Sequence, residues 1–187
     1  MKKILFATLA TVLSAPALAA DSYSVDARHT FPSFEVNHLG FSTQRGRFNK
    51  TTGKIMLDRQ AKTGSVDIVI DAASVDTGLD KLEEHLRGED FFSTEKFPIL
   101  SFKSKSVKFS GDKPAAVEGE FTLLGITKPV TLTISAFNCG VHPINKKDVC
   151  GADALAVIKR SEFGMTKYVP GVSDEVKLFI QVEAFKD

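Results

Sequence analysis

Beyond residue 20 the sequence lacks any long apolar stretch, so no later segment is expected to cross a membrane as a helix. The one apolar run, ILFATLATVLSA, follows Lys2 and Lys3 and precedes Ala17-Leu18-Ala19. Positive charge, a short apolar core and small residues at a cleavage position are typical of a secretory signal peptide. We therefore expect residues 1–19 to be cleaved on export and residues 20–187 to form the mature domain. No cysteine follows the cleavage position, so we expect no lipid anchor and no stable attachment to a membrane.

Neither sign of charge is in excess. Without Lys2 and Lys3, the 24 Lys and Arg residues of the full sequence fall to 22, against 23 Asp and Glu. This balance gives no reason to expect a nucleic acid or an anionic membrane as a partner. The mature length is that of one ordinary domain, large enough to bury a core or to enclose a cavity.

Cysteine is scarce, with Cys139 and Cys150 alone, in the segment CGVHPINKKDVC. In an oxidising compartment two such cysteines are expected to form a disulfide that closes a short loop. A zinc site or a reactive thiol would need further partners, and His142 is the only candidate nearby. We therefore predict a disulfide.

Motifs of catalysis are also missing. The sequence contains no Gly-rich phosphate loop, HExxH, GxSxG or CxxC motif. The histidines are scattered, without a carboxylate at ligand spacing on a shared element, at positions 29, 38, 85 and 142. We therefore predict no metal site and no catalytic residues.

What the sequence does have is alternation of apolar and polar residues, which predicts β-strands with one apolar face each. Turn residues such as Thr52-Gly53, Gly111-Asp112 and Leu124-Gly125 separate the strands by short links, which favour antiparallel neighbours. About eight strands are predicted, around residues 34–38, 54–58, 66–70, 100–109, 117–123, 130–134, 152–160 and 176–182. Eight such strands form either a sandwich or a closed barrel.

One segment has helical spacing instead. Leu79, Leu82 and Leu86 lie on one face, Thr77 and Asp80 resemble a capping box, and Gly88 is expected to end the helix. The acidic residues come early and the basic ones late, where the helix dipole favours each. The clustered charges of residues 80–90 therefore indicate a helix rather than a metal or catalytic site. Leu82 and Leu86 are hypothesised to close one end of a barrel.

Phenylalanine is abundant, with fifteen residues against two tyrosines and no tryptophan. These rings either fill a packed core or, in an eight-stranded barrel, line a space for one elongated ligand. The apolar faces best suited to line such a pore are Phe34, Val36, His38, Ile68, Ile70, Leu100, Phe102, Phe121, Leu123, Leu132, Ile134, Leu178 and Ile180.

Two polar residues continue apolar rows. His38 follows Phe34 and Val36, and it is either a hydrogen-bonded residue at a barrel rim or part of the pore. Arg160 ends the row that includes Ile158, and it either pairs with Glu162 or contacts a polar head group at the cavity mouth.

Several blocks of the sequence together resemble the YceI-like family of bacterial exported, lipocalin-like polyisoprenoid-binding proteins. They are HLGFSTQRGRF (38–48), EEHLRGEDFFSTEKFPILSFKS (83–104), EGEFTLLGITKPVTL (118–132), KRSEFGM (159–165) and SDEVKLFIQVEA (173–184). The blocks occur in order and span nearly the whole mature chain, starting from DARHT (26–30). The cysteine pair departs from the family pattern and looks like an addition at one hairpin.

The resemblance implies an eight-stranded antiparallel barrel with a helix, whose apolar pore holds an isoprenoid or another long-chain amphiphile. It also implies a periplasmic protein without a cofactor, often found as a homodimer. The leading interpretation is therefore a periplasmic carrier. The alternatives are a lipid-modifying enzyme, with His38, Arg160 or the carboxylates of residues 83–90 as candidates, and a filled stress-response barrel without a ligand.

Overall fold

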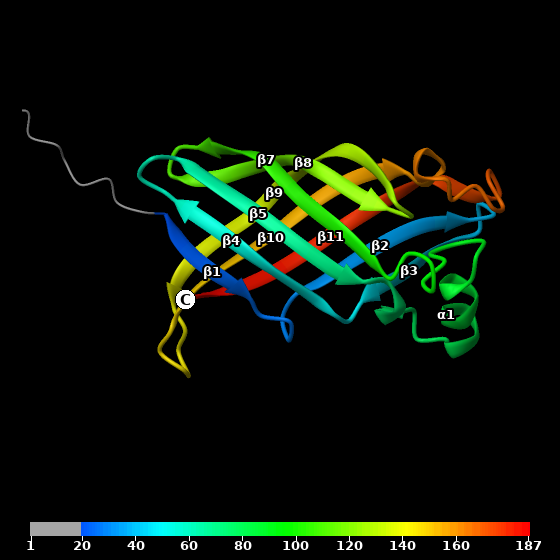
Figure 1. Ribbon diagram of the computed structural model, residues 1–187, viewed down its shortest axis with the longest axis horizontal. Helices are drawn as coiled ribbons and strands as arrows, with labels where there is room; N and C mark the ends of the chain where they lie inside the picture. The colour runs from blue at the N-terminus through cyan, green and yellow to red at the C-terminus, as the bar shows by residue number, and fades with distance from the viewer. Residues whose placement is uncertain (1–19) are drawn as a thin grey trace, which may run out of the picture.

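In the computed structural model, which describes residues 20–187, eight antiparallel strands close into a ring (Figure 1). The ring closes because the last strand, after pairing with its predecessor, also pairs with the first. Its order is β1 (Asp21–Val25), β4 (Thr51–Asp58), β5 (Thr63–Asp71), β7 (Ile99–Ser110), β8 (Lys113–Leu123), β9 (Ile126–Val141), β10 (Asp148–Lys159) and β11 (Val172–Lys186). The predicted eight-stranded antiparallel barrel is confirmed. The predicted signal peptide, residues 1–19, lies outside the described residues.

Three more strands extend the wall beyond the ring. They are β2 (Phe31–His38), β3 (Ser42–Phe48) and β6 (Val75–Asp76), joined in that order to β11. Strand β11 pairs with β1 only through Ala184–Lys186 and with β2 through Val172–Gln181. The predicted strand 34–38 therefore lies in β2, outside the ring of eight strands. Strand β1, which was not predicted, is the eighth strand of the ring instead.

The strands that were not predicted carry little alternation. Strand β1 buries one side chain, Tyr23, and β3 buries only Phe48, because the rest of STQRGRF is polar or glycine. These strands form because partners on either side supply backbone hydrogen bonds: β1 lies between β4 and β11, and β3 between β2 and β6.

One α-helix, α1 (Asp80–Arg87), packs at the end of the barrel where β2 and β3 lie (Figure 1). The helix ends at Gly88 as predicted, and Arg87 lies 3.9 Å from Glu83. The predicted capping box is wrong, because the N-cap residue is Leu79 rather than Thr77 and no side chain caps the helix. The Thr77 N–H donates to the Glu83 carboxylate at 3.0 Å, and Asp80 takes no part. Two short 3-10 turns, η1 (Ala72–Ser74) and η2 (Arg160–Phe163), complete the fold.

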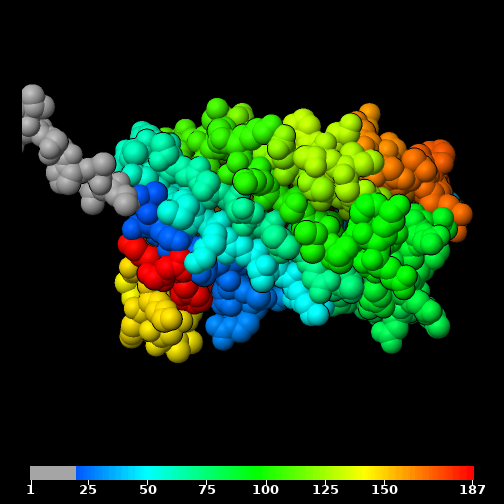
Figure 2. All heavy atoms as spheres, in the orientation of Figure 1, coloured from blue at the N-terminus to red at the C-terminus, as the bar shows by residue number. Residues whose placement is uncertain are grey.

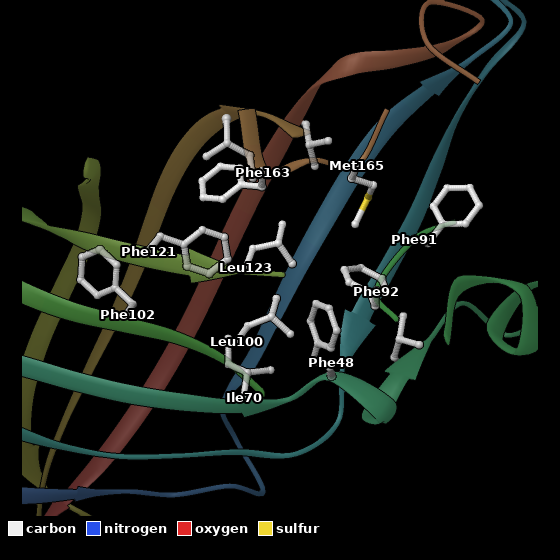
Figure 3. Packing of buried hydrophobic residues seen from close by; sticks show 14 of the residues in the cluster. Phe48, Ile70, Phe91, Phe92, Leu100, Phe102, Phe121, Leu123, Phe163 and Met165 are labelled. Atoms are coloured by element: carbon white, nitrogen blue, oxygen red, sulfur yellow. The ribbon is translucent and has the colours of Figure 1, made fainter. Parts of the chain in front are cut away.

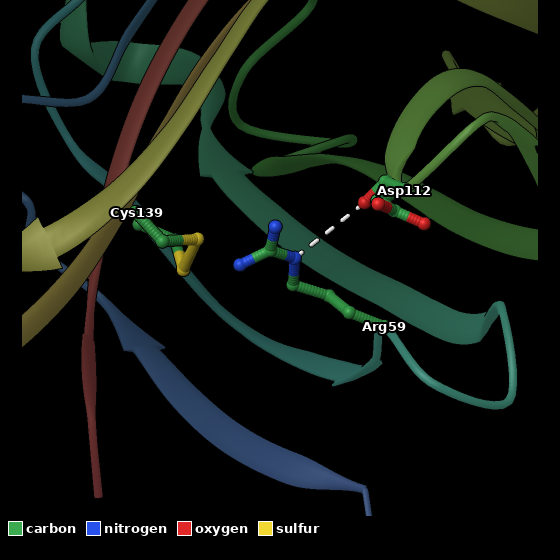
Figure 4. The surroundings of a disulfide bond; sticks show 4 residues. Arg59, Asp112 and Cys139 are labelled. Carbon is green, nitrogen blue, oxygen red and sulfur yellow. Dashed lines mark hydrogen bonds between the residues drawn. A yellow bond between two sulfur atoms is a disulfide. The ribbon is translucent and has the colours of Figure 1, made fainter.

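The disulfide lies at the opposite end of the barrel. Cys139 and Cys150 face each other across β9 and β10 and are joined as predicted, with an S–S length of 2.04 Å (Figure 4). The hairpin that they staple projects from the barrel away from α1 (Figure 2). Close to it, the Arg59 Nε donates to the Asp112 carbonyl oxygen at 3.5 Å, which joins two neighbouring turns (Figure 4).

Candidate ligand cavity

A cavity of about 440 Å³ lies between the barrel wall and α1. Its volume falls within the range of about 300–1,000 Å³ that is typical of small-molecule sites. Apolar side chains predominate in its lining. They come from the ring (Ile70, Leu100, Phe121, Leu123, Ile158, Val172, Val176, Leu178, Ile180), from β2 and β3 (Phe34, Val36, Phe48) and from α1 and the loops (Leu82, Leu86, Phe91, Phe92, Met165, Tyr168).

Helix α1 and the loop that follows it cover the cavity. Leu82 and Leu86 point into it, as hypothesised from their spacing. The Phe92 N–H donates to the Leu86 carbonyl oxygen at 2.9 Å, so the chain folds back beneath the helix. This turn carries Phe91 and Phe92 into the barrel (Figure 3).

Aromatic contacts hold this cover against the wall. The Phe92 ring stands edge-on to Phe48 at 5.3 Å between centroids, and Phe34 lies 6.0 Å from Phe48. Nearer the mouth, Phe91 packs against His85 at 5.0 Å and against Tyr168 at 6.2 Å. Aromatic pairs at these separations stabilise beyond their buried area, so they contribute to holding the cover against the wall.

Most of the predicted pore residues line this cavity. They are Phe34, Val36, His38, Ile70, Leu100, Phe121, Leu123, Leu178 and Ile180. Ile68, Leu132 and Ile134 instead line a second cavity of about 120 Å³ nearer the disulfide, and Ile180 contacts both cavities. Phe102 lines neither cavity and is buried in the core.

Several lining residues were missed by sequence reasoning. Phe48 ends a polar strand, and Phe91 and Phe92 follow the helix terminator, so no alternation marks them as inward-facing. Met165 and Tyr168 lie in the loop between η2 and β11. The only signal for Phe91 and Phe92 was the phenylalanine-rich sequence after the helix, and composition alone does not show which way a side chain points.

Arg160 lines the cavity but does not present its charge to it. Arg160 is 3% exposed, and its guanidinium donates four hydrogen bonds to backbone carbonyl oxygens. Their acceptors and distances are Ser173 (2.9 Å), Met165 (3.0 Å), Lys167 (2.8 Å) and Val172 (2.8 Å). The expected ion pair with Glu162 is not formed, because the guanidinium is bound by backbone carbonyl oxygens instead. These bonds use four of its five N–H donors, and the head-group contact stays a prediction.

The electrostatics of Arg160 follow from this position. Burial lowers the pKa of its guanidinium, and the nearby Asp174 carboxylate partly opposes that shift. Asp174 accepts hydrogen bonds from the Ser161 N–H at 2.8 Å and from its hydroxyl at 2.7 Å, and the backbone bond in particular lowers the pKa of Asp174. Arg160 is part of η2, and its hydrogen bonds to the carbonyl oxygens of residues 165–173 hold that segment against η2.

The predicted candidates for chemistry His38, His85 and Arg160 line the same cavity, whereas the carboxylates of residues 83–90 do not line it. Within residues 20–187 no three His, Cys, Asp or Glu side chains gather as a metal site would require, His85 and Glu89 included. His38 and His85 both line the cavity, where His85 packs against Phe91.

No helix among residues 20–187 is long and apolar enough to span a bilayer.

Comparisons with known proteins give one consistent relationship. Residues 23–184 match the family model of the YceI-like domain. Protein YceI of Escherichia coli O6:H1 is 36% identical over 186 residues, which cover 97% of this chain and 96% of that protein.

Two solved structures share the architecture. Burkholderia cenocepacia BcnA aligns with a TM-score of 0.71 and 25% identity, covering 85% of this chain and 98% of BcnA. A polyisoprenoid-binding domain from Saccharophagus degradans, implicated in plant cell wall breakdown, aligns with a TM-score of 0.67, covering 91% of this chain and all of that domain. At 16% identity, that second likeness shows the fold alone.

Proposed function

The chain belongs to the YceI-like family, and we propose that it is a periplasmic carrier that encloses the apolar chain of an isoprenoid or similar amphiphile. The observation that carries the proposal is the apolar cavity of about 440 Å³ beneath α1. A filled barrel without a ligand would have no use for such a space.

The energetics of burial support a chain-like ligand. Each isoprene unit has five carbons, and at about 0.8 kcal/mol for each buried carbon group it contributes roughly 4 kcal/mol before costs. A few buried units therefore exceed an association cost of several kcal/mol. Most of the lining is apolar, while His38, Gln44 and Thr77 contribute polar groups on the β2, β3 and α1 side. This polarity suits a ligand with an apolar tail and a small polar head.

Export supports the periplasmic part of the proposal. The sequence of residues 1–19 has the pattern of a cleaved signal peptide, and residues 20–187 then form the binding domain. The Cys139–Cys150 disulfide fits an oxidising compartment. The Saccharophagus degradans domain of the same fold is described as polyisoprenoid-binding, and the apolar lining of the cavity is what supports this ligand class for the present chain.

Organic extraction of the purified protein, followed by mass spectrometry, tests this function. We expect a long-chain apolar compound at near one copy per protein, or stoichiometric uptake of a prenyl alcohol by the extracted protein. An empty protein that takes up neither prenyl alcohols nor long-chain amides would contradict it.

A further inference from the structure

The end of the barrel beside α1 exposes a group of apolar side chains. Two loops meet there: the β2–β3 turn, residues 39–41, and the segment 164–171 between η2 and β11. They carry Leu39 (55% exposed), Phe41 (89%), Tyr168 (52%) and Val169 (37%), which we call the apolar rim. Apolar side chains that gather in one patch mark an interaction site, whereas single exposed ones are ordinary.

The two loops are held together as one surface. The Leu39 N–H donates to the Gly171 carbonyl oxygen at 2.7 Å. The Leu39 side chain lies against the same residue, since a Cβ atom added to Gly171 would lie 3.1 Å from the Leu39 Cδ2. Within the second loop, the Val172 N–H donates to the Tyr168 carbonyl oxygen at 2.8 Å. The β2–β3 turn and this loop therefore lie side by side at the α1 end of the barrel (Figure 1).

Two residues of the rim adopt a backbone conformation that bulky side chains rarely take. Leu39 has a φ of 55° and Tyr168 a φ of 62°, in the left-handed region that favours Gly, Asn and Asp. Large apolar side chains at these turn positions combine a backbone cost with exposed apolar area. An apolar environment around the side chains would offset that cost.

The rim continues into the ligand cavity through Tyr168. This residue lines the cavity, packs against Phe91 at 6.2 Å between ring centroids and is half exposed. The apolar surface therefore runs without a break from the cavity to the outside. A long prenyl chain partitions into a bilayer rather than into water, because its carbons are apolar. A rim that rests on a bilayer brings the cavity to the place where such a ligand is found.

The area of the rim suits a bilayer better than a second copy of the chain. At about 250 Å² for a whole aromatic side chain, the four exposed fractions amount to less than about 600 Å². A stable dimer buries about 800 Å² on each partner. Binding to a lipid surface instead scales with the apolar area inserted between head groups and acyl chains, so a small rim gives weak, reversible contact.

The charged residues that flank the rim in the chain are paired. Lys167, which precedes Tyr168, lies 3.2 Å from Asp90, and Arg45, which follows the β2–β3 turn, lies 2.7 Å from Glu35. Anionic lipid is attracted by clusters of unpaired Lys and Arg. We therefore expect the contact to be apolar and to need no anionic lipid.

We propose that the apolar rim rests on the surface of a lipid bilayer while a chain passes between the membrane and the cavity. The inference rests on the proposed function and names the surface from which the carrier takes its ligand. The contact is reversible, because four side chains reach only the boundary of head groups and acyl chains.

A tryptophan reporter tests the contact without any ligand. The sequence has no tryptophan, so Phe41→Trp places a single probe in the rim. With phosphatidylcholine vesicles we expect its emission to shift to shorter wavelength and to be quenched by brominated lipid, equally with and without anionic lipid. Ile144→Trp is the matched control, because Ile144 is 85% exposed at the opposite end, and it should show neither change.

Two outcomes of this measurement overturn the inference. One is an unchanged emission of Phe41→Trp at saturating lipid. The other is a shift that follows protein concentration in the absence of vesicles, which would show that a second copy of the chain covers the rim.

Transfer kinetics test the link to the carrier function. Leu39→Asn with Phe41→Ser removes apolar area from two residues that do not line the cavity, and asparagine suits the backbone of Leu39. We expect the rate of transfer of a fluorescent prenyl alcohol from vesicles to fall at least tenfold, while the affinity for geraniol in water changes less than twofold. Ile144→Ser should keep the wild-type rate.

Failure of the inference and failure of the proposed function give different results. A folded double variant with the wild-type transfer rate overturns the inference and leaves the carrier function intact. A wild-type protein that takes up no prenyl alcohol and no long-chain amide contradicts the carrier function, while the Phe41→Trp emission decides the bilayer contact by itself.

Discussion

The two ends of the barrel are made from the same alternating strands, yet their interiors differ. Toward the disulfide, Tyr23, Leu57 and Ala184 pack with Ile55, Phe109 and Phe137 and leave a cavity of only about 120 Å³. Toward α1, the interior keeps about 440 Å³ although more aromatic rings surround it. The number of apolar side chains at an end therefore does not decide whether that end can hold a ligand.

The difference lies in how the wall closes. At the disulfide end β1 completes the ring between β4 and β11. Toward α1, β11 pairs with β2 instead of β1. The sheet continues there as β2, β3 and β6, and among residues 20–187 β6 does not pair with a strand of the ring. A helix and two loops cover this end. The larger cavity therefore lies at the end of the barrel where β11 pairs with β2 instead of β1.

The largest predicted effect comes from breaking the α1 end at Arg160. Arg160→Met leaves four carbonyl oxygens of residues 165–173 without their donor. We expect the free energy of unfolding to fall by roughly 3–5 kcal/mol, since each buried group left unpaired costs about 1–3 kcal/mol. Urea unfolding followed by circular dichroism measures the change.

Arg160→Lys is the control for charge. It keeps the cation but loses the planar set of donors, so it should recover only part of the loss. A Met variant as stable as wild type would show that the loop does not depend on Arg160.

The second prediction breaks the opposite end. Replacing both Cys139 and Cys150 with serine opens a short loop and should lower the free energy of unfolding by about 3 kcal/mol. Because the cavity lies at the other end, the affinity for a prenyl probe should change less than twofold. A matching loss of affinity in the folded variant would mean that the two ends are not separate in function.

The third prediction places a charge beneath the cover. Leu82→Glu puts a carboxylate into the apolar cavity from a helix position that tolerates glutamate. We expect at least a tenfold loss of affinity for a long-chain probe in a titration, with a small change in stability. Val157→Glu on the outer face of β10, where the residue is 57% exposed, should leave the affinity unchanged.

The smallest prediction concerns Asp26, which lies where β1 gives way to β2. Burial alone would raise the pKa of Asp26, but hydrogen bonds from Arg28 and His29 outweigh it and lower the pKa to about 2. A lowered pKa stabilises the fold above the unfolded-state value of about 4 and loses this contribution as the pH falls toward 2. With screening by solvent, we expect roughly 1 kcal/mol.

Asp26→Asn should therefore be less stable than wild type at pH 7, and the gap should close by pH 2. Urea unfolding at several pH values measures the gap. A gap that is constant over this range would show that the Asp26 charge does not contribute.

Much of the fold was predictable because inward rows repeat every second residue along the longer strands. The alternating rows through Leu100, Phe121 and Leu178 predicted strands, and in the structure these side chains face the interior of the barrel. Helix α1 followed from its leucine spacing and from Gly88, and the disulfide followed from the two cysteines.

The rest depends on contacts between distant segments. Strand β1 is held by its neighbours rather than by its own pattern, and Phe91 and Phe92 enter the barrel because the chain turns back after α1. The burial of Arg160 depends on a loop that returns to it.

The most direct test of the carrier function is to locate the tail of a bound chain. A farnesyl analogue with a diazirine at the tail end, crosslinked by light and mapped by mass spectrometry, reports the residues that the tail touches. We predict labelling of Leu100, Phe121 or Leu123 at the depth of the large cavity and none of Tyr23 or Leu57. Labelling confined to the outer face of the barrel, with saturable binding, would contradict the account.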